Sequence, residues 1–325
     1  ERMTTVLVTG GAGYIGSQTC KALAAAGYSV VTYDSLVYGH EHAVKWGSFV
    51  RGDILDRDRL IETMKEHRPS AVLHFAAFAY VGESVSEPEK YYRNNVLGSF
   101  TLLSAMRECG IDKIVFSSTC ATYGIPDRIP ITEDARQHPE NPYGSTKFLV
   151  ERMLADYRSA YGLKSIALRY FNAAGADPDG EIGEDHEPET HLIPLVLQAA
   201  GGTRPSITVF GNDYDTPDGT CIRDYVHVAD IAEAHILALA KLEQGEHRPA
   251  YNLGTERGTS VAEIIAAARK VTGKPISVVM GERRSGDPAC LLADSSLARK
   301  ELGWRPRYRD IEGIIETAWK WTERS

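Results

Sequence analysis

The sequence predicts an α/β fold, in which a doubly wound parallel sheet is joined to a second, smaller α/β lobe. Short β-branched runs alternate with helical stretches as far as residue 172, and this alternation is typical of parallel sheets with helical crossovers. The chain of 325 residues is also longer than one hydrophobic core usually supports. We therefore expect domains at residues 1–173 and 174–325, with a stretch near residues 224–245 returning to the first.

The elements predicted for the first domain alternate along the chain. Strands are expected at residues 5–9, 29–33, 71–75, 113–117 and 165–170. Helices are expected at residues 14–26, 57–67, 91–108 and 143–161. Strands separated by helices of this length imply a parallel sheet that is covered on both faces.

The second domain begins with a predicted surface loop at residues 175–189, which are rich in Gly, Asp, Glu and Pro. After this loop, helices are expected at residues 192–200, 228–242, 260–272 and 311–322. Short strands are expected at residues 207–210 and 276–279.

Composition and charge exclude several classes of protein. The content of 43% hydrophobic and 25% charged residues is that of an ordinary soluble protein, without an apolar run of ~20 residues for a membrane span. The first five residues lead straight into an apolar strand and leave no room for a signal peptide, so a cytoplasmic protein is expected. The net charge of −8 disfavours partners such as nucleic acid or an acidic membrane.

The five cysteines form an odd set without CxxC spacing. This pattern argues against a disulfide framework and against a zinc site. We expect free thiols that mostly serve as small core residues, and no metal site.

A glycine run between the first strand and the first helix predicts a dinucleotide site. Gly10, Gly13 and Gly16 allow a tight turn and a close approach of backbone N–H groups to a pyrophosphate at the helix N-terminus. Asp34 ends the second strand, where its carboxylate accepts both ribose hydroxyls and repels a 2′-phosphate. The expected cofactor of this Rossmann-like domain is therefore NAD. Asp53 is placed near the adenine, and a helix-capping role for it stays open.

Tyr143 and Lys147 are four residues apart and therefore share one face of a predicted helix. A neighbouring cation and a positively charged nicotinamide both favour the phenolate form of a tyrosine, which then serves as a base toward a sugar hydroxyl. Thr119 follows the strand at residues 113–117, at the sheet edge where ligands bind, and is expected to bond the reacting hydroxyl. These three residues form the predicted catalytic set.

With these features in place, the chain resembles the extended short-chain dehydrogenase/reductase superfamily and, within it, the UDP-glucose (UDP-galactose) 4-epimerase family. The resemblance runs over essentially the whole length. Two motifs occur throughout the superfamily, GGAGYIG at residues 10–16 and PYG at residues 142–144. Motifs specific to the branch are FGNDY at residues 210–214, DGT at 218–220, RDY at 223–225 and RRSGD at 283–287.

The resemblance implies two sets of binding residues. Besides the three glycines, the NAD is lined by Tyr14, Ile15, Asp34, Ser35, Leu36, Gly39, Asp53, Ile54, Phe75, Ala76, Ala77, Asn94, Ser117, Tyr143, Lys147 and Phe171. Besides Thr119 and Tyr143, the UDP-sugar is held by Asn172, His191, Leu192, Thr208, Val209, Phe210, Arg223, Tyr225, Arg284 and Asp287. Arg223 and Arg284 suit a diphosphate because guanidinium groups form charge-assisted bonds with phosphate oxygens.

The chain departs from the family pattern at four positions. Ala79 stands where many members carry lysine, so a cation near the cofactor is absent there. Thr119 replaces a common serine and keeps the hydroxyl, while His191 replaces a frequent asparagine near the phosphates. Leu291, at the position that gates the sugar pocket, is neither the bulky tyrosine associated with small sugars nor the small residue associated with N-acetylated sugars.

The resemblance implies interconversion of UDP-glucose and UDP-galactose. The reaction would pass through a 4-keto sugar, which rotates to present its other face before the hydride returns. UDP-pentose and UDP-N-acetylhexosamine 4-epimerases stay open as alternatives, since SSTCATYG and AYVGES segments also occur in the pentose group. A 4,6-dehydratase is disfavoured because Cys120 and Ala121 occupy the places of its acidic pair. A non-catalytic NAD-sensing regulator of the same fold usually lacks the tyrosine or the lysine.

Family members also suggest a homodimer joined through residues 91–108 and 143–161.

Overall fold

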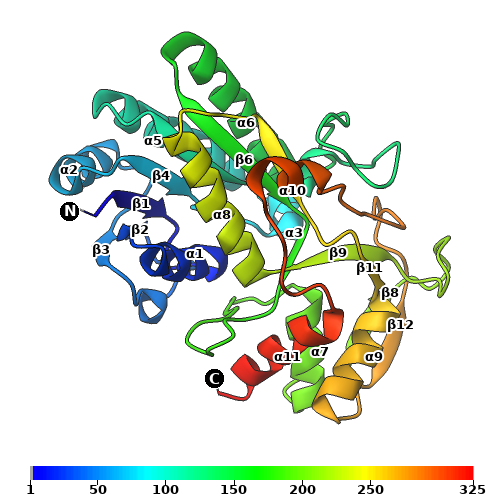
Figure 1. Ribbon diagram of the computed structural model, residues 1–325. Coiled ribbons are helices and arrows are strands. Elements are labelled where there is room, and N and C mark those ends of the chain that lie inside the picture. The colour runs from blue at the N-terminus through cyan, green and yellow to red at the C-terminus, as the bar shows by residue number, and fades with distance from the viewer. Residues whose placement is uncertain (1–2, 325) are drawn as a thin grey trace.

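The computed structural model describes residues 3–324 and confirms a Rossmann-like α/β fold (Figure 1). Its main sheet has seven strands, and every neighbouring pair is parallel. The strand order is β3-β2-β1-β4-β5-β6-β10, so the order reverses between β1 and β4, where ligands of such sheets bind. The strands are β1 (Thr5–Thr9), β2 (Ser29–Asp34), β3 (Ser48–Arg51), β4 (Ala71–His74), β5 (Lys113–Thr119), β6 (Lys164–Tyr170) and β10 (Ala250–Leu253).

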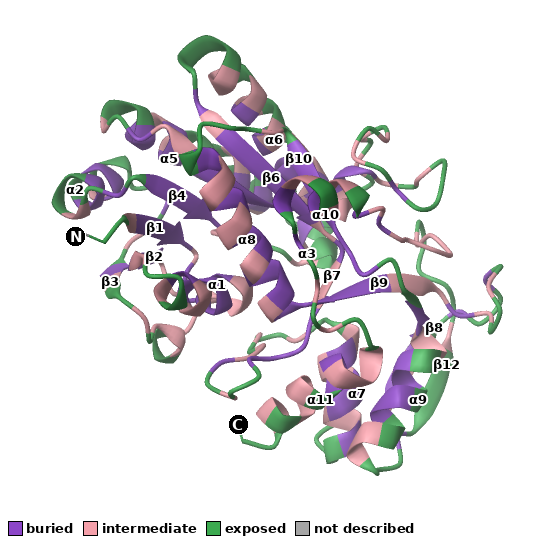
Figure 2. Ribbon diagram, viewed as in Figure 1, coloured by how far each residue is buried: buried purple, intermediate pink, exposed green. Residues whose placement is uncertain are grey.

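The two faces of this sheet form two separate cores. Successive side chains of a strand point to opposite faces, and so Val6 and Val8 of β1 join one core whereas Leu7 joins the other. All three side chains are fully buried. Figure 2 shows the buried central strands between outer helices whose far sides are exposed. Continuous apolar runs in the strands follow from this two-sided burial.

Helices cover both faces of the sheet. One face packs against α1 (Tyr14–Ala25) and α8 (Val228–Glu243), which lie side by side. The other face packs against α2 (Arg57–His67), α5 (Gly98–Glu108) and α6 (Pro142–Tyr161). Shorter elements of this lobe are η1 (Glu41–Ala43), α3 (Val81–Ser86), α4 (Pro88–Tyr91), η2 (Tyr92–Leu97), η3 (Cys120–Thr122) and α10 (Ser296–Leu302).

The smaller lobe lies beyond the carboxyl ends of the main strands (Figure 1). Its core joins three helices to β8, and β12 pairs with β8 in parallel at the outer edge. A second small sheet, β11-β9-β7, runs between the lobes. The elements are β7 (Asn172–Ala174), α7 (Leu192–Gly201), β8 (Ile207–Phe210), β9 (Ile222–His227), β11 (Gly258–Ser260), α9 (Val261–Thr272), β12 (Val278–Gly281) and α11 (Ile311–Thr322).

The chain returns to the first lobe over a longer stretch than predicted. We expected the return near residues 224–245, but β10 pairs with β6 as an edge strand of the main sheet, and α10 packs against it. The four-residue strand β10 follows a polar segment and lacks a long apolar pattern, which explains why the sequence did not reveal it. The division of the chain into two domains remains our proposal.

Two local expectations need correction. The helix expected at residues 91–108 is divided into α4, the π-helical turn η2 and α5, and such π-turns are often found at functional sites. The strand expected at residues 276–279 lies at Val278–Gly281. The five cysteines are all free; Cys20 is buried in a core, Cys109 and Cys120 are half-buried against core clusters, and Cys221 and Cys290 are half-buried elsewhere.

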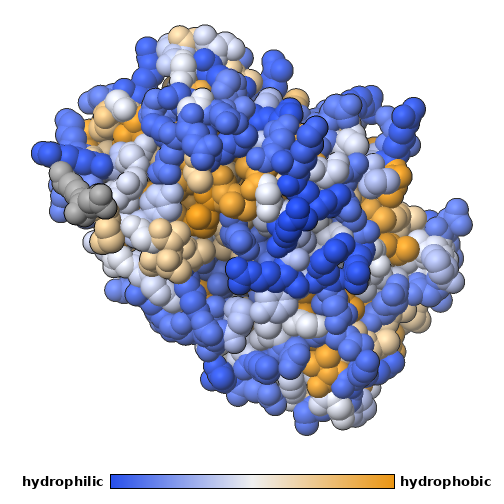
Figure 3. All heavy atoms as spheres, in the orientation of Figure 1, coloured by the Kyte–Doolittle hydropathy of each residue, from blue (hydrophilic) through white to orange (hydrophobic). Residues whose placement is uncertain are grey.

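The outer surface is largely polar. On the face shown in Figure 3, hydrophilic residues cover most of the area and apolar residues form separate small groups. Within residues 3–324, no helix is both long enough and apolar enough to cross a membrane. The apolar residues of the chain are instead gathered in the sheet cores and the core of the smaller lobe.

Asp224, the central residue of the RDY motif, is a structural anchor. It is fully buried in β9, and its carboxylate accepts hydrogen bonds from the backbone of Thr255, Glu256 and Ala293 at 2.8, 3.1 and 3.2 Å. The Thr255 hydroxyl adds a bond of 3.0 Å. One carboxylate therefore joins β9 to the segment after β10 and to the segment before α10.

We expect Asp224→Ala to lower the free energy of unfolding by about 3 kcal/mol or more, because buried N–H donors would lose their acceptor. Urea unfolding monitored by circular dichroism measures the change. Asp127→Ala, at an exposed position that is far from β9 in the sequence, is the matched control and should leave the midpoint nearly unchanged. An equal effect of both substitutions would contradict the anchoring role.

Candidate active site

The turn between β1 and α1 has no room for a side chain at Gly10 or Gly16. Gly10 has a φ of +74°, and a Cβ there would lie 2.6 Å from the backbone nitrogen of Ala76, after β4. A Cβ on Gly16 would lie 2.1 Å from the Gly10 carbonyl oxygen. Gly13 caps α1 without a side-chain hydrogen bond, so the first N–H groups of the helix have no cap. This uncapped N-terminus is suited to an anionic group.

Asp34 fixes the same loop from the end of β2. Its Oδ2 accepts the N–H of Ala12 at 3.0 Å, and its Oδ1 accepts the N–H of Leu36 at 2.8 Å. Burial raises the pKa of Asp34, and the two backbone bonds oppose this shift. Gly39 lies against the carboxylate, since a Cβ there would approach both oxygens to 3.0 Å. Each oxygen retains a lone pair for a further donor.

Tyr143 and Lys147 lie one turn apart near the start of α6, as predicted. Asn141 caps this helix by accepting the N–H of Gly144 at 2.8 Å, and Ser84 of α3 accepts the N–H of Tyr143 at 3.1 Å. The Thr119 side chain, at the end of β5, lies close enough to the Tyr143 phenol to lower its pKa. Both side chains line the cavity at the carboxyl edge of the sheet.

Burial shifts the pKa values of both side chains of this pair. Burial raises the pKa of Tyr143 well above that of a free phenol, although the nearby Thr119 side chain lowers it. Burial also lowers the pKa of Lys147 to about 7, against the opposing charge of Glu151. The Lys147 ammonium donates to the Ser117 carbonyl oxygen at 2.8 Å instead of stabilising the phenolate. Without further positive charge in the site, the phenol therefore keeps its proton.

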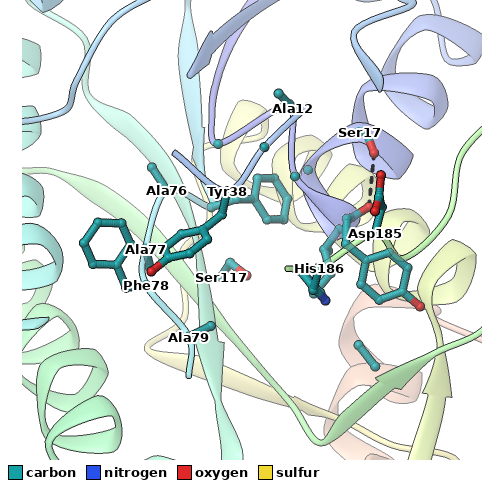
Figure 4. A pocket seen from close by; sticks show the side chains of 18 of the residues that line it. Ala12, Ser17, Tyr38, Ala76, Ala77, Phe78, Ala79, Ser117, Asp185 and His186 are labelled. Atoms are coloured by element: carbon teal, nitrogen blue, oxygen red, sulfur yellow. Dashed lines mark hydrogen bonds between the residues drawn. The ribbon is translucent and has the colours of Figure 1, made fainter. Parts of the chain in front are cut away.

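One cavity of about 350 Å³ joins these parts. It extends from the glycine loop and Asp34 to the catalytic set, with strand ends on one side and the loop after β7 on the other. Figure 4 shows Ala76, Ala77 and Phe78 across the cavity from Asp185 and His186. The predicted residues that line it are Gly10, Gly13, Tyr14, Ile15, Gly16, Asp34, Ser35, Gly39, Asp53, Ile54, Phe75, Ala76, Ala77, Asn94, Ser117, Thr119, Tyr143, Lys147, Phe171, Asn172, His191, Leu192 and Tyr225.

The remaining predicted residues lie outside this cavity. Leu36 has a left-handed φ of 62° and serves Asp34 through its backbone. The others belong to the smaller lobe or its junction, and are Thr208, Val209, Phe210, Arg223, Arg284, Asp287 and Leu291.

The two predicted phosphate-binding arginines are held by protein groups. Arg223 forms an ion pair of 2.9 Å with Asp287, and the Arg284 guanidinium lies 4.0 Å over the ring of Phe210. The charge of Arg223 also acts on the neighbouring Cys120 thiol, whose pKa burial raises to about 12. Arg223 therefore lies near the end of the cavity that holds Thr119 and Tyr143. Its partner Asp287 is also one of the residues expected to bind the UDP-sugar.

Leu291 stands behind the cavity wall. It packs in a small apolar cluster with Tyr123, Ile131 and Phe171, of which Phe171 lines the cavity. Its N–H donates to the Ile222 carbonyl oxygen at 3.0 Å, which joins the segment to β9. A change of volume at this position would therefore reach the cavity through Phe171.

The expected binding residues did not include Tyr80, His186 or Tyr170, which all line the cavity. Tyr170 ends β6, and its hydroxyl is 2.7 Å from that of Ser117. The run of His and Glu residues within 184–191 was the one available signal for the loop after β7.

Lys90 brings a positive charge close to the cavity wall near Ala79. The Lys90 ammonium donates to the hydroxyl of Tyr38 at 2.9 Å and to Glu83 at 2.8 Å. It also lies 5.1 Å over the ring of Phe78. Lys90 therefore places positive charge behind the cavity wall. The alanine at position 79 had suggested only that a cation is absent from this region.

Comparisons with known proteins agree with this geometry. The family model described as the NAD dependent epimerase/dehydratase family matches residues 6–254. The chain belongs to this family. It is 55% identical to the UDP-glucose 4-epimerase of Rhizobium meliloti (strain 1021), over 98% of this chain and 97% of that protein.

Two solved structures of the family are close in shape. The UDP-glucose 4-epimerase from Brucella ovis in complex with NAD is 56% identical, with a TM-score of 0.96 and 98% of both chains covered. The UDP-glucose-4-epimerase from Stenotrophomonas maltophila with bound NAD and formylated UDP-arabinopyranose is 43% identical, also with a TM-score of 0.96, and covers 99% of this chain and 98% of that one. These findings confirm the resemblance seen in the motifs.

For this member of the epimerase/dehydratase family, the buried Lys147 has a measurable consequence for stability. Its pKa is about 7 in the folded chain and near 10.5 when exposed, so between these values the unfolded chain binds more protons. The contribution of Lys147 to the free energy of unfolding therefore rises with pH between about 7 and 10.5.

We expect Lys147→Met to remove this contribution. The difference in free energy of unfolding, wild type minus variant, should rise by up to ~1.4 kcal/mol per pH unit between about pH 7 and 10. Urea titrations of dinucleotide-free protein at several pH values measure it. Parallel pH profiles for the two proteins would show that Lys147 is not buried as described.

Proposed function

We propose that the chain is an NAD-dependent UDP-glucose 4-epimerase, which interconverts UDP-glucose and UDP-galactose. One observation carries this proposal: Tyr143, Thr119 and Lys147 face the same cavity as the glycine loop and Asp34. A dinucleotide laid along the loop would thus extend toward a tyrosine and a threonine hydroxyl. Relatives that are more than half identical over nearly their whole length carry the same activity in their names.

The residues of the cavity fit NAD. The close approach at Gly10 and Gly16 leaves the uncapped start of α1 open to a pyrophosphate. Asp34 offers carboxylate oxygens for ribose hydroxyls, and its negative charge disfavours a 2′-phosphate. When bound, NAD supplies the redox chemistry by accepting a hydride from the sugar and returning it.

The protein side of the chemistry is proton movement at one hydroxyl. Tyr143 takes the proton of the C4 hydroxyl, and Thr119, close to the Tyr143 phenol, orients that group. Because burial holds the phenol protonated in the unliganded protein, positive charge must enter the site before Tyr143 can act as a base. Lys147 sits in the same buried environment and holds the Ser117 carbonyl on the cavity wall.

The surroundings of Thr119 support epimerisation over dehydration. The two residues that follow it in η3 are Cys120 and Ala121, and neither is a carboxylic acid. Burial raises the pKa of Cys120 to about 12, which keeps this thiol neutral at physiological pH. Elimination of water needs an acid and a base at this place, and the chain provides neither there.

The substrate assignment is tested by incubating purified protein, without added reductant, with UDP-galactose, UDP-N-acetylgalactosamine and UDP-arabinose in parallel. We expect the highest kcat/KM with UDP-galactose. A clear preference for UDP-arabinose would favour the UDP-pentose alternative, since the similar Stenotrophomonas maltophila protein holds a formylated UDP-arabinopyranose. No turnover with any substrate despite full NAD occupancy would favour a non-catalytic NAD-sensing role.

Tyr143→Phe should keep bound NAD and lose at least ~100-fold in kcat, since the base is removed while the ring remains. Tyr161→Phe, on the same helix but half exposed and outside the cavity, is the matched control and should retain the wild-type rate. Bound NAD is measured by absorbance after denaturation of the protein. A Tyr143→Phe enzyme of near-normal rate would rule out Tyr143 as the base.

We also propose that the protein is a homodimer joined through η2, α5 and α6. These neighbouring elements expose Tyr92, Leu97, Phe100 and Leu149, each to between 37% and 48%. Grouped apolar side chains on an otherwise polar surface are typical of an interface. The same helices carry Asn94 and Tyr143, so pairing would also stabilise one wall of the cavity.

We expect the double variant Leu97→Glu, Phe100→Glu to elute as a monomer in size-exclusion chromatography with light scattering. Burying two carboxylates without partners in an interface is strongly unfavourable. Val279→Glu, at a comparably exposed apolar position on β12, should leave the dimer intact. A wild-type monomer, or an equal response of both variants, would refute this interface.

A further inference from the structure

The loop between β7 and α7, residues 175–191, forms one side of the cavity without any helix or strand. Its contacts with the first lobe are largely ionic. Lys21 of α1 pairs with Asp177, Asp179 and Glu181 at 2.6–2.9 Å, and His40 lies 3.4 Å from Asp185. The last part of the loop is held differently, by four of its own side chains: Glu184, His186, Glu189 and His191.

These four side chains are spaced like the ligands of a metal ion. Their nitrogen and oxygen atoms all lie within 4.8 Å of one another. His186 Nδ1 is 3.2 Å from Glu184 Oε1 and 3.6 Å from Glu189 Oε2, and His191 Nδ1 is 3.8 Å from Glu189 Oε1. Ligand atoms ~2.0–2.1 Å from a tetrahedral zinc ion are ~3.3 Å apart. His191 Nδ1 also forms a hydrogen bond with Glu184 Oε1, so these two groups would move apart when the four atoms close around one ion.

Burial and charge also favour a divalent cation here. The side chains of Glu184 and Glu189 are only 7% and 8% exposed. Within residues 3–324, neither carboxylate forms an ion pair with a lysine or an arginine; both lie against the two imidazoles, and Glu189 also accepts the N–H groups of Thr190 and His191 at 2.8 Å. Two buried carboxylates require compensating charge. Two protonated imidazoles supply it here, and a divalent ion with two neutral histidines would supply the same charge.

The other clusters of the loop lack this combination. The carboxylates of Asp177, Asp179 and Glu181 already share the Lys21 ammonium, which occupies the place of a cation. The group of His40, His42 and Asp185 has a single carboxylate and is largely solvent-exposed. These two clusters serve as internal comparisons.

We propose that Glu184, His186, Glu189 and His191 bind one divalent transition-metal ion of the zinc class, which fixes the loop at the rim of the cavity. Two imidazoles with two carboxylates suit Zn²⁺, whereas Mg²⁺ and Ca²⁺ prefer oxygen ligands throughout. Four protein ligands make the site structural and not catalytic. His186 also packs edge-on against Tyr14 at 6.0 Å and Tyr80 at 6.3 Å, so the ion would order this part of the cavity wall.

The test uses full-length protein without a histidine tag, stripped with EDTA and titrated with Co²⁺ as a spectroscopic probe. We expect about one equivalent to bind with the intense visible absorption of tetrahedral cobalt, and Zn²⁺ to displace it. His186→Asn and Glu189→Gln should each abolish these bands. His42→Asn, in the exposed neighbouring cluster, and His247→Asn, at a distant exposed position, should retain them.

The readout is a spectrum, so it does not depend on which sugar nucleotide the enzyme accepts. Circular dichroism verifies that each variant is folded, and Glu189→Gln preserves side-chain shape should His186→Asn be unstable. Loss of the bands in His42→Asn but not in His186→Asn would assign the ion to the exposed cluster and overturn the proposal. Weak octahedral bands that are equal in all variants would do the same.

Discussion

The close approach of three backbone segments around the β1–α1 loop is the constraint on which the whole site depends. Gly16 leaves no room for a Cβ beside the Gly10 carbonyl, and Gly10 leaves none beside Ala76. The Asp34 carboxylate then holds the loop through the N–H of Ala12. Since this contact sets where α1 begins relative to the ends of β2 and β4, it also sets where an anion and a ribose can lie.

Burial decides how the catalytic end of the cavity behaves. Tyr143 and Lys147 are both shielded from water, and desolvation disfavours the charged form of each group. The Tyr143 phenol therefore holds its proton, and the Lys147 amine, with a pKa of about 7, is only partly charged near neutral pH. In the proposed mechanism, the positive charge that Tyr143 needs to act as a base is that of the bound cofactor.

Ionic contacts control the opposite side of the cavity. The loop at residues 175–191 has no regular secondary structure, and its position depends on pairs such as Lys21 with Asp177 and on the His–Glu cluster at its end. Isolated surface ion pairs contribute little, whereas buried and shared ones can order a segment. The side chains that complete the cavity thus come from a segment whose order depends on charge balance.

The sequence by itself determined the features that rest on local geometry. The glycine run, the alternation of β1 and the spacing of Tyr143 and Lys147 follow from turn sterics and from the periods of strand and helix. The longer helices of the first lobe and five strands of its sheet were predictable for that reason, whereas the four-residue strands β3 and β10 were not among the predicted strands. The whole-length family resemblance added the sugar-nucleotide class.

Only the tertiary structure decided which groups lose water and which partners they meet. The pairing of Arg223 with Asp287, the anchoring by Asp224 and the late return of β10 all join segments far apart in the chain. The expectation that no metal binds rested on the cysteines and did not consider the His and Glu residues within 184–191, which the folded loop brings together. Burial and charge balance depend on packing between distant segments, and a linear pattern does not record that packing.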